Sequence, residues 1–215
     1  MSVVVLTVDQ RGSRRDVDRV DELLMHLAAT ADPLRAFERT AGDEVQGVFD
    51  DPAAAAATAL DIAETFTGRW SIGIGIGDAE QPLPSTTRAG RGPAFELARD
   101  AVTRAKSLRH GVAVAGQEGD TARDAHSALT LAAALLTRRS ATGREAVALM
   151  RTGVTQAAAA AALGITPQAM SQRLHNADWD LEDDARRLAA NTLARAAGRA
   201  TGQPTATGRT EGAHR

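Results

Sequence analysis

Hydrophobic positions in the first half of the chain alternate between the period of a strand and that of a helix. Residues 3–8, VVVLTV, form a short β-branched run that is typical of a buried strand. Apolar side chains from Val17 to Leu27 then recur at helical spacing, and Pro33 ends the predicted helix. The pattern therefore predicts a strand followed by an amphipathic helix.

The same alternation continues to about residue 116. Residues 34–49 are strand-like on both sides of Gly42-Asp43-Glu44, which predicts a hairpin with an acidic turn. In residues 70–76, WSIGIGI, glycine occupies every second position, so another backbone can approach one face of this strand closely. The remaining predicted elements are a helix over 52–66, a helix over 95–108 and a strand over 111–115. The order βαββαβ followed by an αβ unit predicts a ferredoxin-like, palm-type domain over residues 1–116.

Strand signals vanish after about residue 120, where the chain becomes rich in alanine, leucine and arginine. Residues 117–197 therefore predict an all-α domain, with residues 127–137 as a connector or dimerisation helix. A final helix after Trp179 is expected to pack its apolar face on the trihelical unit that contains the helix-turn-helix, or on a second subunit. Residues 198–215 are rich in Gly, Thr and Arg and predict a disordered tail. The fold class is α+β.

The amino-acid composition excludes several classes of protein. Hydrophobic residues make up 43% of the 215 residues, and the absence of cysteine excludes disulfide frameworks and thiolate sites. No apolar run reaches the roughly 20 residues that span a bilayer, so a cytoplasmic protein without a membrane partner is expected. The formal net charge is −2, but residues 138–177 carry five arginines against Glu145 alone. Such a local basic patch is the minimum electrostatic footprint of a DNA-binding module.

Three carboxylates are expected to meet at one end of the predicted sheet. In the split-βαβ order, the end of the first strand lies beside the turn that joins the second and third strands. Asp9 stands at the first place, and Asp43 and Glu44 stand at the second. Mg²⁺ takes one or two protein carboxylates and completes its shell with phosphate and water, so these residues are candidate ligands for Mg²⁺ with a nucleotide.

Residues beside this edge are candidate phosphate ligands. The loop Arg11-Gly12-Ser13-Arg14 follows Asp9 and is expected to open the first helix, where backbone N–H groups favour anions. Arg91, before the helix that begins near Pro93, offers another phosphate contact. The motifs themselves contain no lysine to hold a triphosphate. The structural alternative is that Asp9 ends a strand, Asp43 makes a turn and Ser13 caps a helix.

Four sequence blocks, in this order, resemble the SatD family of small bacterial proteins. The blocks are TVDQRGSR at 7–14, AGDEVQG at 41–47, WSIGIGIG at 70–77 and GRGPAFELARDA at 90–101. The layout is also similar to the palm of nucleotidyl and diguanylate cyclases. Those enzymes place a metal-binding acid at the end of the first strand and a GG(D/E)EF turn in the hairpin. Here the turn reads AGDEV, so the resemblance implies nucleotide or metal binding more than cyclase activity.

Residues 143–177 carry the second signal, a helix-turn-helix pattern. Thr155 is a natural N-cap for a helix over 156–163, and Gly164 supplies a turn residue of positive φ. Thr166 and Pro167 then cap and begin the next helix, with Met170 and other apolar residues on its buried face. The stretch TQxxxAxxLGITxxxMSxxL resembles the DNA-reading half of LuxR-type regulators and of sigma-factor region four. The alternative is a helical hairpin that only packs.

In the geometry that this resemblance implies, the second helix enters the major groove of double-stranded DNA. Its outward residues are the predicted base readers, and glutamine can pair bidentately with adenine. Arg151 and Arg173 are expected on phosphates, as is the backbone at Thr155. The predicted readers are Gln168, Ala169, Ser171, Gln172 and His175.

These patterns favour a DNA-binding transcriptional regulator whose palm-like domain senses a nucleotide or phosphorylated ligand. A single module with few phosphate contacts binds DNA weakly, so a homodimer that reads two half-sites is expected. Two alternatives stay open at this point. One is a cyclase-like nucleotidyl-transfer enzyme tethered to DNA, and the other is a non-catalytic adaptor with a vestigial palm.

Overall fold

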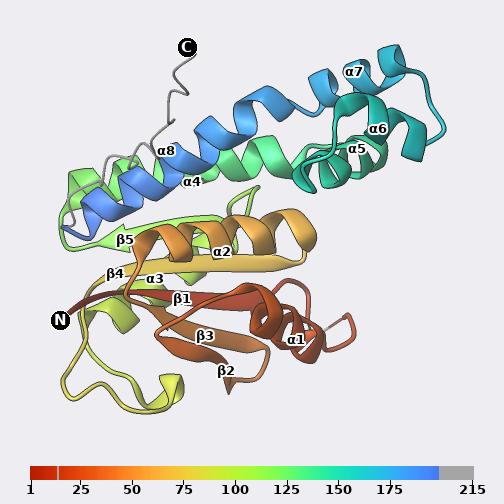
Figure 1. The fold of residues 1–215 in the computed structure, drawn as a ribbon. Coiled ribbons are helices and arrows are strands. Elements are labelled where there is room, and N and C mark those ends of the chain that lie inside the picture. Colours follow the sequence, from red (N-terminus) through yellow and green to blue (C-terminus); the bar gives the residue numbers. More distant parts are fainter. Residues whose placement is uncertain (14, 199–215) are drawn as a thin grey trace, which may run out of the picture.

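A computed structural model describes residues 1–13 and 15–198 of the chain. Its centre is a mixed five-stranded sheet with helices on both faces (Figure 1). The strand order is β2-β3-β1-β4-β5; β4 and β5 are parallel, and the other neighbours are antiparallel. The strands are β1 (Ser2–Gln10), β2 (Arg35–Ala41), β3 (Glu44–Phe49), β4 (Trp70–Asp78) and β5 (Val112–Gly116). The fold therefore combines helices with a sheet of mostly antiparallel strands, which is compatible with the predicted α+β class.

Eight α-helices lie within the described residues, and each predicted helix is among them. Two 3₁₀ turns, Thr87–Ala89 and Trp179–Leu181, join neighbouring elements. The first four helices are α1 (Val20–Thr30), α2 (Pro52–Thr65), α3 (Pro93–Ala105) and α4 (Gly119–Thr137). The others are α5 (Ala141–Arg151), α6 (Gln156–Ala162), α7 (Pro167–Asn176) and α8 (Glu182–Ala196).

The two faces of the sheet are covered unequally. Alternate residues of β1 point to opposite faces, so that Val4 and Leu6 pack with α1, α2, α4 and α8, whereas Val3 and Val5 pack with α3. On the face of the sheet that meets α3, strand β4 is flat because Gly73 and the other alternate glycines have no side chains. A Cβ on Gly73 would lie 2.1 Å from the backbone nitrogen of Val102 in α3. The close approach predicted for this strand is thus confirmed.

Helices α4 and α8 follow the predicted domain boundary at residue 116, but their buried residues belong to the core of the sheet domain. Leu129 and Leu136 of α4, and Ala189 and Leu193 of α8, belong to the same buried cluster as the strands. Helix α8 therefore lies against α2 and α4, and not against the helix-turn-helix unit as expected. Helix α4 also begins at Gly119, earlier than the predicted connector helix.

Helices α5, α6 and α7 form a second, smaller core at one corner of the molecule (Figure 1). No helix within residues 1–13 and 15–198 is long and apolar enough to cross a membrane. The tail predicted to be disordered lies, from residue 199 onward, outside the described residues.

Candidate functional site

The three predicted acidic residues meet at one end of the sheet. Asp9 in β1 stands opposite Glu44 in β3, and the backbone N–H of Gln10 donates to the carbonyl oxygen of Asp43 at 3.3 Å. Directly opposed residues on antiparallel strands point to the same face, so Asp9 and Glu44 share the α3 face. The backbone positions of Asp9, Asp43 and Glu44 thus lie at the same end of the sheet, as the sequence predicts.

Lys106 changes the chemistry of this end of the sheet. Its Nζ donates to Oδ2 of Asp9 at 2.8 Å, from the turn after α3. The motifs contain no lysine, but the fold brings in a residue 97 positions away. Glu44 is likewise engaged, because its Oε1 accepts from Oγ1 of Thr40 at 2.7 Å.

The described residues at this end of the sheet form no ready-made metal site. The ammonium of Lys106 pairs with Asp9, and because Lys106 is half-exposed this ion pair is weak. No group of three or more His, Cys, Asp or Glu residues in the described part of the chain could hold a metal ion by itself. A site for Mg²⁺ with a nucleotide stays a prediction.

Arg11 is buried partly beneath the start of β4 and binds backbone. Its Nη2 donates to the carbonyl oxygens of Ala105 at 2.8 Å and Leu108 at 2.7 Å, and its Nε donates to Oγ of Ser71 at 3.1 Å. The side chain thus gives a second donor to two carbonyls, at the end of α3 and in the turn after it, that already accept from backbone N–H groups. Burial lowers the pKa of the Arg11 guanidinium from its ordinary value. The N–H groups of Nε and Nη2 of Arg11 therefore hold the fold together.

The loop after Arg11 does not open a helix, which corrects the predicted phosphate cradle. Gly12 makes a turn at φ 70°, Ser13 follows it, and α1 begins only at Val20. Buried Gln10 shapes the intervening segment, since its side chain accepts from the backbone N–H of Arg19 and donates to the carbonyl of Val17. Arg14 lies outside the described residues.

Arg91 is at the opposite end of the sheet from Asp9. The backbone carbonyl of Arg91 accepts from the N–H of Glu80, just beyond the end of β4, and Asp78 pairs with Ser2 at the start of β1. The length of a nine-residue strand, about 30 Å, separates the two ends. Arg91 therefore cannot join a ligand site with Asp9 and Arg11.

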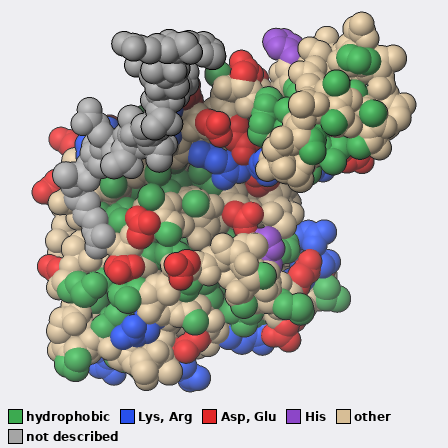
Figure 2. Space-filling view, viewed as in Figure 1, with side chains coloured by type: hydrophobic (Ala, Val, Ile, Leu, Met, Phe, Trp, Pro, Cys, Tyr) green, Lys and Arg blue, Asp and Glu red, His purple; other side chains and the backbone are tan. Residues whose placement is uncertain are grey.

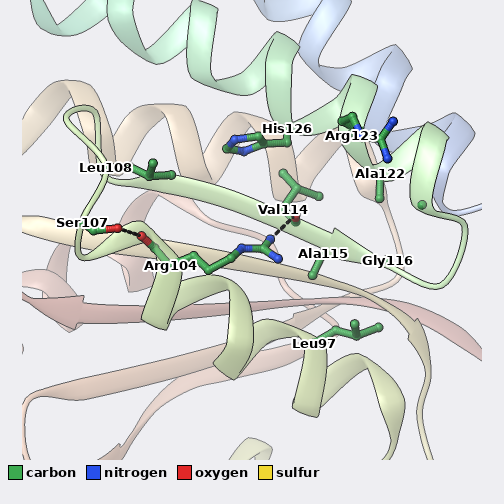
Figure 3. A pocket seen from close by; sticks show the side chains of 11 residues that line it. Leu97, Arg104, Ser107, Leu108, Val114, Ala115, Gly116, Ala122, Arg123 and His126 are labelled. Atoms are coloured by element: carbon green, nitrogen blue, oxygen red, sulfur yellow. Dashed lines mark hydrogen bonds between the residues drawn. The ribbon is translucent and has the colours of Figure 1, made fainter.

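A cavity of about 530 Å³ lies between α3 and α4 at the free edge of β5 (Figure 3). Its wall is mostly apolar, with side chains such as Leu97 and Val114. Nη2 of Arg104 donates to the carbonyl of Val114 at 2.7 Å and so covers part of the strand edge. Burial, followed by the positive charge of Arg104, lowers the pKa of His126. No motif predicted this cavity, because its residues meet only in the folded chain.

Helices α6 and α7 have the local chemistry that the second motif predicts. Oγ1 of Thr155 accepts from the N–H of Ala158 at 3.2 Å, and Oγ1 of Thr166 accepts from the N–H of Ala169 at 3.1 Å. Gly164 stands between the helices at φ 63°. Both helices bury small or apolar residues against α5: Ala159, Ala160, Met170 and Leu174.

The predicted base readers form the outer surface of α7. All five of them, Gln168, Ala169, Ser171, Gln172 and His175, are exposed. Gln172 is held by a 2.8 Å hydrogen bond from its Nε2 to Oδ1 of Asn176. Arg173 is half-buried, with its Nη1 3.7 Å from Oε2 of Glu145. On the visible face of this unit, charged side chains are few (Figure 2).

Arg151 does not lie with these residues but joins a set of ion pairs that we call the arginine–glutamate cluster. Its Nη2 is 2.8 Å from Oε2 of Glu64 in α2 and also contacts Glu182 in α8. The guanidinium of Arg151 thus holds α5 on the sheet domain and, in this arrangement, does not bind the DNA phosphate that the sequence predicts for it. The members of the cluster are Glu64, Arg139, Arg151, Glu182 and Arg186.

Arg139 lies at the centre of the cluster. Its side chain is fully buried, and its Nη1 is 3.1 Å from Oε1 of Glu64 and 2.8 Å from Oε2 of Glu182. Its Nε donates to the carbonyl of Ala177 at the end of α7. Burial by itself would raise the pKa of Glu182, but hydrogen bonds from Arg186 and Arg151 outweigh it and hold the pKa below its ordinary value. Glu182 therefore stays charged at neutral pH.

A scan against protein-family models found no match to this chain, and a search of curated proteins found none either.

Proposed function

We propose that the protein is a DNA-binding regulator that reads double-stranded DNA with α7. The observation that carries this proposal is the pairing of two side-chain-capped helices, joined at Gly164, with an outer surface on α7 made of uncharged hydrogen-bonding side chains. Glutamine and serine on the first turns of a helix suit base edges in the major groove. Helix α7 also lies at a corner of the molecule, where a duplex can reach it (Figure 1).

The sheet domain is proposed to be the sensor. The order β2-β3-β1-β4 with antiparallel neighbours supports a ferredoxin-like, palm-type plan to which β5 is added. The helix-turn-helix unit reaches this domain through the arginine–glutamate cluster, which joins α2, α5 and α8. A ligand of the sensor can change DNA binding only if it has different affinities for two arrangements of these parts.

A dimer is part of the proposal because the reading surface has few basic side chains. Arg138 is paired with Asp178, Arg151 lies in the cluster, and Arg173 faces Glu145. Few phosphate contacts give weak binding for one module, whereas two modules on neighbouring half-sites add their free energies.

Charge substitutions on α7 test the proposal. Gln168→Glu and Gln172→Glu place a carboxylate beside the phosphates, so each is expected to weaken duplex binding by about tenfold or more. Gln117→Glu is the matched control, because it makes the same change at an exposed residue before α4. Fluorescence anisotropy with labelled duplex DNA at two salt concentrations measures the effect. Equal loss in all three variants, or binding that does not respond to salt, would contradict the proposal.

A further inference from the structure

We propose that a small cationic pocket beneath the helix-turn-helix unit binds the phosphate group of a ligand, which deepens the proposed sensor function and rests on it. The pocket has a volume of about 210 Å³ and lies at the end of the sheet where β1 ends and β4 and β5 begin. Four chain segments form its wall: the loop after β1, the α2–β4 turn, the α3–β5 turn and the end of α4.

Charge is the first reason for an anion. Three arginines, Arg11, Arg109 and Arg138, line the pocket together with the imidazole of His110, and none of the described carboxylates is part of its wall. Arg109 is exposed, and its side chain makes no hydrogen bond or ion pair among the described residues. Arg11 donates through Nε to the hydroxyl of Ser71 and through Nη2 to two backbone carbonyls, which leaves Nη1 without a partner in the described part of the chain. Arginine donors of this kind suit phosphate oxygens.

Trp70 provides a reporter for this pocket. Its side chain forms part of the pocket wall and is 4% exposed. Its indole Nε1 is enclosed and has no hydrogen-bond acceptor within the described residues. An anion held by the arginines would lie beside this ring, so the emission of Trp70 can report its binding.

The size of the pocket favours phosphate over a larger ligand. Thr67 and Thr137 also line it, but their hydroxyls donate to the backbone carbonyls of Glu64 and Ala133 at 2.7 Å, so the arginines supply the donors. The volume is below the range of about 300–1,000 Å³ that holds drug-sized molecules, so the pocket fits one or two phosphate groups and leaves any further part of a ligand outside.

The pocket is connected along the chain to the arginine–glutamate cluster, which holds the helix-turn-helix unit. Arg138 lines the pocket, and the next residue, Arg139, is the buried centre of the arginine–glutamate cluster. Arg138 also pairs with Asp178, immediately after α7. A phosphate that draws Arg138 toward the pocket competes with Asp178 and so biases how α7 is held.

Pyrophosphate titration of the full chain tests the site through tryptophan fluorescence. The chain has two tryptophans, so Trp179→Phe leaves Trp70 as the reporter. We expect a saturable change in emission with pyrophosphate and none with chloride at equal ionic strength. In the same background, Arg109→Ala should weaken binding by about tenfold or more. Arg99→Ala, an exposed arginine of α3 outside the pocket, is the matched control.

The outcomes separate this inference from the proposed function, because the titration contains no DNA. An absent or chloride-like response, or equal affinities of the Arg109→Ala and Arg99→Ala variants, would overturn the phosphate site whatever the protein does with DNA. Saturable pyrophosphate binding that depends on Arg109 would support it even if α7 proved not to read DNA.

Discussion

Single residues of β4 decide how closely α3 approaches the sheet. The missing side chains of Gly73 and Gly75 leave room for the backbone of α3, and the isoleucines between them fill the other face. A built Cβ on Gly75 would lie 2.2 Å from the carbonyl oxygen of Ala94 and 2.3 Å from the nitrogen of Ala98. These contacts are with helix backbone, which cannot turn aside as a flexible side chain can.

Gly75→Ala is therefore expected to lower the free energy of unfolding by about 3 kcal/mol or to prevent folding, since α3 must move as a unit. Gly119→Ala is the control, because a Cβ there meets no atom within 4 Å and lies in the first turn of α4. We expect the control to be neutral or slightly stabilising. Urea denaturation followed by circular dichroism measures both, and equal stability of the two variants would show that the packing of α3 is not this tight.

At the scale of elements, the reading unit depends on its caps. Helix α6 has seven residues and α7 has ten, so neither is long enough to be stable by itself. Their first turns are held by the hydroxyls of Thr155 and Thr166. The caps fix where α7 begins and hence which side chains face outward.

Thr166→Ala is expected to cost about 1 kcal/mol of stability in this unit, through the loss of the cap. Thr103→Ala removes the same atoms from an exposed position inside α3, where threonine bonds only the preceding turn, and should be neutral. Thermal denaturation of both variants provides the comparison. A larger loss in the Thr103 variant would contradict the role of the cap.

Much of this element structure could be predicted from the sequence, because its causes are local. The acidic turn, the alternating glycines and the caps at Thr155 and Thr166 all depend on residues within a few positions of one another. Lys106 beside Asp9, Arg11 on the end of α3 and Arg151 in the cluster could not be predicted, because each contact spans more than 60 residues. The predicted start of α1 is too early, because the hydrogen bond between the side chain of buried Gln10 and the backbone of Arg19 exists only in the folded chain.

At the scale of the whole molecule, the arginine–glutamate cluster holds the reading unit on the sheet domain. Glu64→Ala removes a carboxylate that three arginines share and leaves Arg139 buried with less compensation. We expect a loss of about 3–5 kcal/mol and faster hydrogen exchange in α5–α7. Glu80→Ala, at an exposed position after β4, should change neither. Unchanged exchange in the Glu64 variant would mean that other contacts hold the unit.

The cluster also predicts a sign for the pH dependence. Because the pKa of Glu182 is lowered in the folded state, its stabilising contribution is complete above its ordinary value and is lost as the pH falls through the lowered one. Asp16 and Asp18 have lowered pKa values as well, so the whole protein loses stability in acid. Glu182→Gln should make this loss shallower between about pH 5 and pH 3. Urea titrations across this range measure it, and an unchanged slope would refute the assignment.

The most direct measurement for the central proposal is selection of bound duplexes from a random DNA library by the full chain. The account predicts enrichment of a short motif, present as one half-site or as two related ones, and loss of preference at one position of the motif in a Gln172→Ala variant. No enrichment over the starting library, or an identical motif for wild type and variant, would contradict the reading of DNA by α7.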